Sequence, residues 1–142
     1  SFPTRRSSDL VVRPSVAARL LADAVRTLRA AQVEVVVGSC PDLGAVRPLG
    51  SPLRQVASRM SRELASAQKD EVVRAGGRCV PLADIVGDLF YRQPELYFSA
   101  DQFHPSSIGY HAVALAMLPD VLRAAGIARS VPAITASSDS AA

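Results

Sequence analysis

The stretch VEVVVG, residues 33–38, decides the fold of this chain. It is a short, almost continuous run of β-branched residues, which is typical of a parallel strand that is covered on both faces. The loop that follows, residues 40–50, is rich in Pro and Gly and would leave the carboxyl end of this strand. Open α/β sheets place their ligands at that end. The strand therefore predicts an α/β fold and marks where a site should lie.

Helical patterns flank this strand on both sides. Apolar residues recur every three or four positions over residues 15–31, after a helix start at Pro14. A second helix is predicted to begin at Ser51-Pro52 and to end at Gly76-Gly77. Its expected buried stripe is Leu53, Val56, Met60, Leu64 and Ala67.

A second short strand is predicted over residues 78–82, where Pro81 favours a position at the edge of the sheet. The alternation of helix and strand predicts a doubly wound sheet with parallel strands near 33–38 and 78–82. Residues 84–103 are expected to form a long connection, and a last helix should run from Pro105 to about Leu118, where Pro119 would end or kink it.

Most of the aromatic residues lie in the connection, and two interpretations of them stay open. They are either a small packed cluster or an apolar wall beside an active site that receives an acyl or aryl group. The residues are Phe90, Tyr91, Tyr97, Phe98 and Phe103.

Asp101 and His104 are the candidate catalytic residues. An imidazole takes a proton from a hydroxyl near neutral pH, and a nearby carboxylate fixes its tautomer and stabilises the imidazolium that forms. Three positions apart in a tight turn, the carboxylate can reach one ring nitrogen and leave the other free. Alone, the pattern Asp-x-x-His is equally typical of a solvated turn before a helix.

The wider pattern Asp101-x-x-His104-Pro105, followed by Gly109-Tyr110 in an Ala-rich helix, resembles the last conserved block of the SGNH (GDSL-like) hydrolases. The Val-rich strand that leads into residues 38–44 is similar to the strand and loop that precede this block, particularly in actinobacterial esterases and lipases. The resemblance covers about residues 11–125. It implies a three-layer α/β/α, flavodoxin-like SGNH hydrolase fold, of which residues 11–126 would be the C-terminal part.

The resemblance implies a serine ester hydrolase that acts on a small-molecule ester through an acyl-serine intermediate, with no cofactor and no metal. His104 would act as general base and then general acid, and Asp101 would orient it. We expect Phe103, Pro41 and Asp42 to contact substrate. The family's Gly-Asp-Ser block and its two oxyanion-hole blocks do not occur in this sequence, so the chain alone is expected to be inactive.

Two other classes of function stay open. The chain could be a non-catalytic module that binds a carbohydrate or another ligand on the same scaffold. It could also be another α/β protein, flavodoxin-like or nucleotide-binding, in which the acid and the histidine are incidental. The sequence contains no Gly-rich phosphate loop, which argues against a nucleotide site.

The ends of the chain carry separate expectations. Residues 1–10 resemble the conceptual translation of a sequencing adapter, which would place the true upstream part of the gene product outside this sequence. Residues 127–142 are predicted to be a disordered tail.

Composition limits the remaining classes. The length of 142 residues fits a single domain, and no apolar run approaches the roughly 20 residues of a membrane span. The net charge of +3 is diffuse, with Lys69 the only lysine, so no nucleic-acid surface is predicted.

No metal site and no disulfide are predicted either. Cys40 and Cys79 should be free thiols, because an offset of about five residues along adjacent strands separates them by roughly 16 Å. No His, Cys or Asp cluster has zinc spacing, and His111 should lie at the surface of the last helix.

Overall fold

The computed structural model of the protein describes residues 13–127. The expectations for residues 1–10, and for the tail beyond residue 127, lie outside this range. The described elements are, in order, α1 (Pro14–Ala30), β1 (Val36–Gly38), the 3₁₀ turn η2 (Leu43–Ala45), α2 (Leu53–Arg74), β2 (Arg78–Val80), α3 (Leu82–Arg92), α4 (Pro94–Tyr97) and α5 (Ser107–Ala124).

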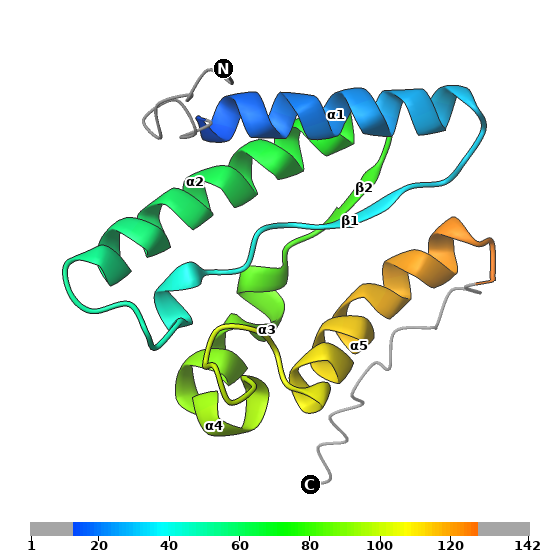
Figure 1. The fold of residues 1–142 in the computed structure, drawn as a ribbon. Helices are drawn as coiled ribbons and strands as arrows, with labels where there is room; N and C mark the ends of the chain where they lie inside the picture. The colour runs from blue at the N-terminus through cyan, green and yellow to red at the C-terminus, as the bar shows by residue number, and fades with distance from the viewer. Residues whose placement is uncertain (1–12, 128–142) are drawn as a thin grey trace, which may run out of the picture.

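The sheet of the described residues consists of β1 and β2, which pair in parallel with Val37 opposite Cys79. The connection between them is α2, so β1, α2 and β2 form one β-α-β unit (Figure 1). The predicted α/β class is therefore confirmed at this level. Both strands are shorter than the predicted ranges 33–38 and 78–82.

Helices contribute to the packing on both faces of the sheet. Val35, Val37 and Cys79 pack against a cluster formed by α1 and α2, which includes Val25 and Val72. The alternate strand residues Val36 and Val80 belong to a second cluster, formed with α3, α5 and the segments around η2. The alternation follows from the two-residue period of side chains along a strand.

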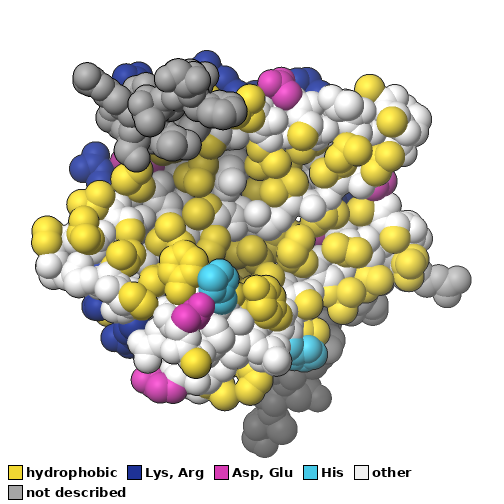
Figure 2. Space-filling model, viewed as in Figure 1, with side chains coloured by type: hydrophobic (Ala, Val, Ile, Leu, Met, Phe, Trp, Pro, Cys, Tyr) yellow, Lys and Arg dark blue, Asp and Glu magenta, His cyan; other side chains and the backbone are white. Residues whose placement is uncertain are grey.

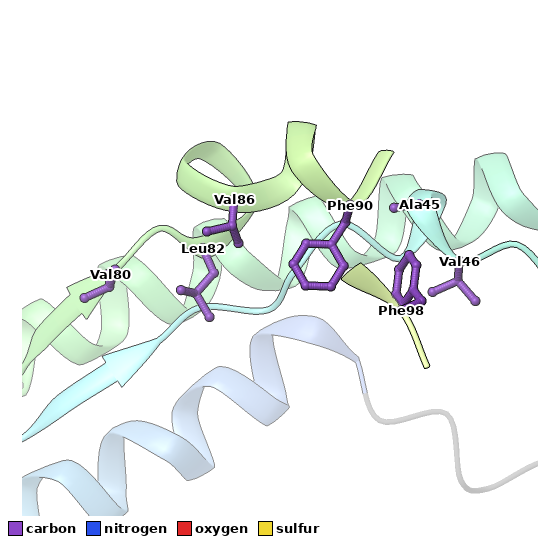
Figure 3. Packing of buried hydrophobic residues seen from close by; sticks show 7 residues of the cluster. All are labelled: Ala45, Val46, Val80, Leu82, Val86, Phe90 and Phe98. Atoms are coloured by element: carbon purple, nitrogen blue, oxygen red, sulfur yellow. The ribbon is translucent and has the colours of Figure 1, made fainter. Parts of the chain in front are cut away.

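The second cluster is the larger one and lies next to the carboxyl ends of the strands. Figure 3 shows its buried side chains following one another from Val80 through Leu82 and Val86 to Phe90 and Phe98. The rings of Phe90 and Phe98 meet edge to face with centroids 5.0 Å apart, a favourable arrangement for two aromatic rings. The packed-cluster interpretation of the aromatics is therefore correct for these two residues.

The predicted long connection over residues 84–103 was wrong for its first half, because α3 and α4 occupy it. Leu82, Val86 and Phe90 recur at intervals of four and form the buried face of α3. This helical spacing is visible in the sequence and outweighs the aromatic content that suggested a loop.

The last helix also differs from the expectation. It begins at Ser107, with Ser106 as N-cap, while Pro105 lies before it in an antiparallel bridge to Phe98. Pro119 lies inside α5, which continues to Ala124, so Pro119 does not end the helix. Proline costs a helix one backbone hydrogen bond, and packing of α5 against α3, α4 and both strands compensates for that loss.

The predicted buried stripe of α2 was also wrong in its first half. Leu53, Val56 and Met60 are exposed, whereas Ser61 and Val72 are buried. Exposed apolar residues also lie on α1 and α5, and Figure 2 shows hydrophobic side chains spread across the face that carries α1, β1 and α5. None of the described residues covers these side chains.

Both cysteines are free thiols, as predicted. The register places Cys79 beside Val37, three positions before Cys40, so the predicted offset of five residues was too large. Burial raises the pKa of both thiols above the usual range. Within residues 13–127 no helix is long and apolar enough to cross a membrane.

Candidate functional site

The loop between α4 and α5 carries the acid and the histidine, and it is closed by its own hydrogen bonds. The amide of Ser99 donates to the carbonyl of His104 at 2.8 Å, and the amide of Ser106 donates to the carbonyl of Tyr97 at 2.8 Å. Gln102 makes the tight turn with a φ of 54°. We call residues 97–106 the acid–histidine loop.

Within this loop the Asp101 carboxylate contacts the His104 ring directly. Its Oδ2 lies 2.6 Å from Nδ1 of His104. Its Oδ1 accepts hydrogen bonds from the amides of Phe103 and His104, both at 3.0 Å, and from the hydroxyl of Ser99 at 2.8 Å. The carboxylate is thus held by several donors, and it can fix both the orientation and the tautomer of the ring.

The other ring nitrogen, Nε2, has no hydrogen-bond partner among residues 13–127, and the His104 side chain is 65% exposed. In Figure 2 a histidine side chain beside an acidic one lies on a surface surrounded by hydrophobic side chains. The arrangement therefore offers one restrained and one accessible nitrogen, which is the geometry a general base needs.

Hydrogen bonding lowers the pKa of Asp101 well below its ordinary value. The largest contribution is the hydrogen bond from the His104 ring, followed by the backbone amides of Phe103 and His104 and then by the Ser99 hydroxyl. Each of these donors favours the ionised form.

This shift gives a testable pH dependence. Because the pKa of Asp101 is lowered on folding, its contribution to loop stability is present above the ordinary pKa of 3.8 and is lost only as the pH falls through the lower folded value. We expect the side-chain carboxyl ¹³C signal of Asp101 to titrate with a midpoint below pH 3.8 in an NMR titration. Ser99→Ala should move the midpoint upward. A midpoint at the ordinary value in the unaltered chain would contradict this account.

A small apolar pocket of about 120 Å³ lies beside the acid–histidine loop. Its walls come from the segment after β1, from α3, from the loop and from α5. The lining residues are Pro41, Asp42, Leu43, Ala45, Val46, Leu82, Val86, Gly87, Phe90, Phe98, Phe103, Pro105 and Val113.

The structure thus brings together the three residues expected to contact substrate. Pro41, Asp42 and Phe103 all line this pocket, and the Phe103 ring lies edge to face with the His104 ring at a centroid distance of 5.0 Å. The carboxylate of Asp42 is held by the Gly44 amide at 2.7 Å, with the Ser58 hydroxyl and Arg62 also near it. Asp42 therefore also caps the turn η2.

Several residues of this region were missed in the sequence. Ser99 bonds to Asp101 and could have been found as the polar residue two positions before it. Gly87 and Val113 line the pocket from α3 and α5, and no local pattern indicates this, because their approach depends on how the helices pack. His111 is exposed on α5, as predicted.

A larger cleft of about 530 Å³ involves α2 and α3 but neither Asp101 nor His104. It is lined by side chains of both charges, among them Arg54, Arg62 and Asp84. No group of three metal-binding side chains occurs within the part of the chain that the structure describes.

The fold and the site are those of an α/β protein with an acid–histidine pair in a loop directly before a helix. The chain is 47% identical over 93 residues to a GDSL-like esterase of Mycobacterium tuberculosis. The match covers 66% of this chain and 30% of that esterase, so the chain spans less than a third of its relative. No family model and no solved structure matches the chain. The matched segment of this chain is thus similar in sequence to part of a GDSL-like esterase.

Proposed function

We propose that this chain is the acid–base part of a serine ester hydrolase of the SGNH (GDSL-like) type. The contact between Asp101 Oδ2 and His104 Nδ1 at 2.6 Å, with the carboxylate held by three further donors, carries this proposal. The name of the mycobacterial relative supports it. In the proposed protein, residues 11–126 form the C-terminal part of a three-layer α/β/α domain.

The mechanism follows from the protonation of His104. The ionised Asp101 carboxylate can accept a hydrogen bond but cannot donate one. The neutral His104 ring therefore carries its hydrogen on Nδ1, and Nε2 is free to accept a proton. As a serine hydroxyl attacks the ester carbonyl, Nε2 takes the hydroxyl proton, and the imidazolium is stabilised by Asp101. The same proton then passes to the leaving alcohol, which departs and leaves the acyl-serine.

Hydrolysis of the acyl-serine repeats the sequence with water. Nε2 takes a proton from the attacking water, and the serine oxygen receives it back as the carboxylic acid is released. These steps need a nucleophilic serine and an oxyanion hole. The 142-residue sequence contains no Gly-Asp-Ser block that would supply the serine. The proposal therefore assigns those groups to a segment of the enzyme outside these 142 residues.

The proposal predicts an activity that depends on joining the two parts. We expect a chimaera, in which residues 13–127 replace the corresponding segment of the mycobacterial esterase, to hydrolyse p-nitrophenyl butanoate. The 142-residue chain alone should show no turnover, because it lacks the nucleophile block.

Two outcomes would overturn this assignment. Ester turnover by the chain alone that disappears in His104→Ala would show that the nucleophile lies within it. A chimaera that folds, as judged by circular dichroism, but does not hydrolyse esters would favour the alternative, a non-catalytic module that binds a carbohydrate or another ligand.

A further inference from the structure

The apolar pocket beside His104 differs from the rest of the exposed apolar surface in being concave and framed by four separate parts of the chain. Its lining holds one charged residue, Asp42, whose carboxylate is already occupied by the Gly44 amide and by Arg62. A polar or charged ligand group would therefore find few partners in it. The lining is suited to a hydrocarbon group.

The position of the pocket relates it to the reaction. Phe103 and Pro105, the two neighbours of His104 in the chain, both line it. His104 itself does not line the pocket but is the chain neighbour of two of its wall residues. The ester carbonyl must come close to this base, so a group attached directly to the carbonyl carbon can reach into the pocket.

We propose that this pocket binds the acyl group of the ester and limits it to a straight chain of about four carbons. The inference rests on the proposed function, since it assumes an ester as substrate. The volume of about 120 Å³ is that of roughly four water-sized groups at ~30 Å³ each, and a methylene is of similar size. The acyl side is preferred to the alcohol because the alcohol must leave after the first step, whereas the acyl group stays until water attacks.

Val113 offers a direct way to change the size of the pocket. It lies on α5 and lines this pocket but not the larger cleft, whereas Gly87 lines both. Val113→Phe is expected to occupy ligand space. Val113→Ala removes two methyl groups and enlarges the same space.

The first test is ligand binding to the ¹⁵N-labelled 142-residue chain, followed by NMR. The probes are the methyl esters of acetic, propanoic, butanoic, hexanoic and octanoic acid. We expect affinity to rise about fourfold per methylene up to butanoate, since each buried methylene adds that factor, and to rise no further beyond it. The amides of Gly87, Phe103 and Val113 should shift on binding.

The variants make the test specific. Val113→Phe should remove the gain of butanoate over acetate, and Val113→Ala should extend the rise to hexanoate. Val121→Phe is the matched control, because Val121 is exposed on the same helix and does not line the pocket. Three results would overturn the proposal. They are an affinity that does not depend on acyl-chain length, amide shifts confined to α1 and β1, and a dependence on chain length that neither pocket variant changes.

Turnover by the chimaera separates this proposal from the proposed function. We expect kcat/KM to rise from p-nitrophenyl acetate to butanoate and to fall at octanoate, and to vary little from methyl to butyl acetate. If the chimaera is active but its kcat/KM depends on the length of the alcohol, or on neither the acyl group nor the alcohol, only the pocket assignment is overturned. An inactive chimaera whose chain still shows the binding series overturns the proposed function alone.

Discussion

Replacing His104 by alanine in the chimaera is expected to lower kcat by about 10⁴- to 10⁶-fold, close to the effect of removing the histidine in studied serine proteases. Without the imidazole the nearest described base is the Asp101 carboxylate, which is a far weaker base and a poor acceptor for the proton of the nucleophile. KM should change little, because the ring does not line the proposed acyl pocket. The measurement is steady-state hydrolysis of p-nitrophenyl butanoate with active-site titration of the serine.

Asp101→Asn tests the second half of the pair. An amide in place of the carboxylate can donate to Nδ1 and so favours the tautomer with the proton on Nε2, which cannot act as base. The expected loss in kcat is about 10⁴-fold. His111→Ala is the control for both variants, because this histidine is exposed on α5 and pairs with no acid in the described residues. If His104→Ala were as active as His111→Ala, His104 would not be the general base.

The second large effect is expected at Gly109, in the first turn of α5. A Cβ at this position would lie 2.2 Å from the carbonyl oxygen of Tyr97 and about 3 Å from Pro105 and Phe90. The oxygen belongs to backbone and also accepts the Ser106 amide, so it cannot move away without opening the acid–histidine loop. Gly109→Ala should therefore destabilise the chain by about 1–3 kcal/mol, the usual cost of overpacking.

Gly87→Ala is the matched control for this prediction. Gly87 is also helical, but a Cβ there meets no atom within 4 Å. Because alanine restricts the unfolded chain and suits a helix better than glycine, this variant should gain about 0.5–1 kcal/mol. Urea unfolding of both variants measures the difference in free energy. A Gly109→Ala variant as stable as the unaltered chain would show that the helix can shift without cost.

The main features of the fold could be predicted from local patterns. The β-branched run near Val36 and the proline at the start of α1 predicted a strand and a helix that the structure contains. The acid–histidine contact also follows from a short pattern, since Asp101 and His104 lie three residues apart in a turn that their own backbone closes.

The predictions that failed concern features that depend on tertiary packing. The continued helix beyond Pro119 is held by contacts with α3 and the strands, which no local rule contains. The stripe of Leu53, Val56 and Met60 has the correct helical spacing, but in this half of α2 the contacts with η2 are made by Ser58 and Ser61. The pocket likewise depends on how α3 and α5 approach each other.

The closed acid–histidine loop has a consequence for how such enzymes diverge. All hydrogen bonds that hold the Asp101 carboxylate come from residues 99–104, whereas the nearby pocket takes walls from four distant segments. In the proposed esterase, substitutions of pocket residues such as Val86 on α3 or Val113 on α5 can therefore alter which molecules are accepted and leave the contact between Asp101 and His104 in place. Substrate preference can thus evolve separately from the proton-transfer geometry.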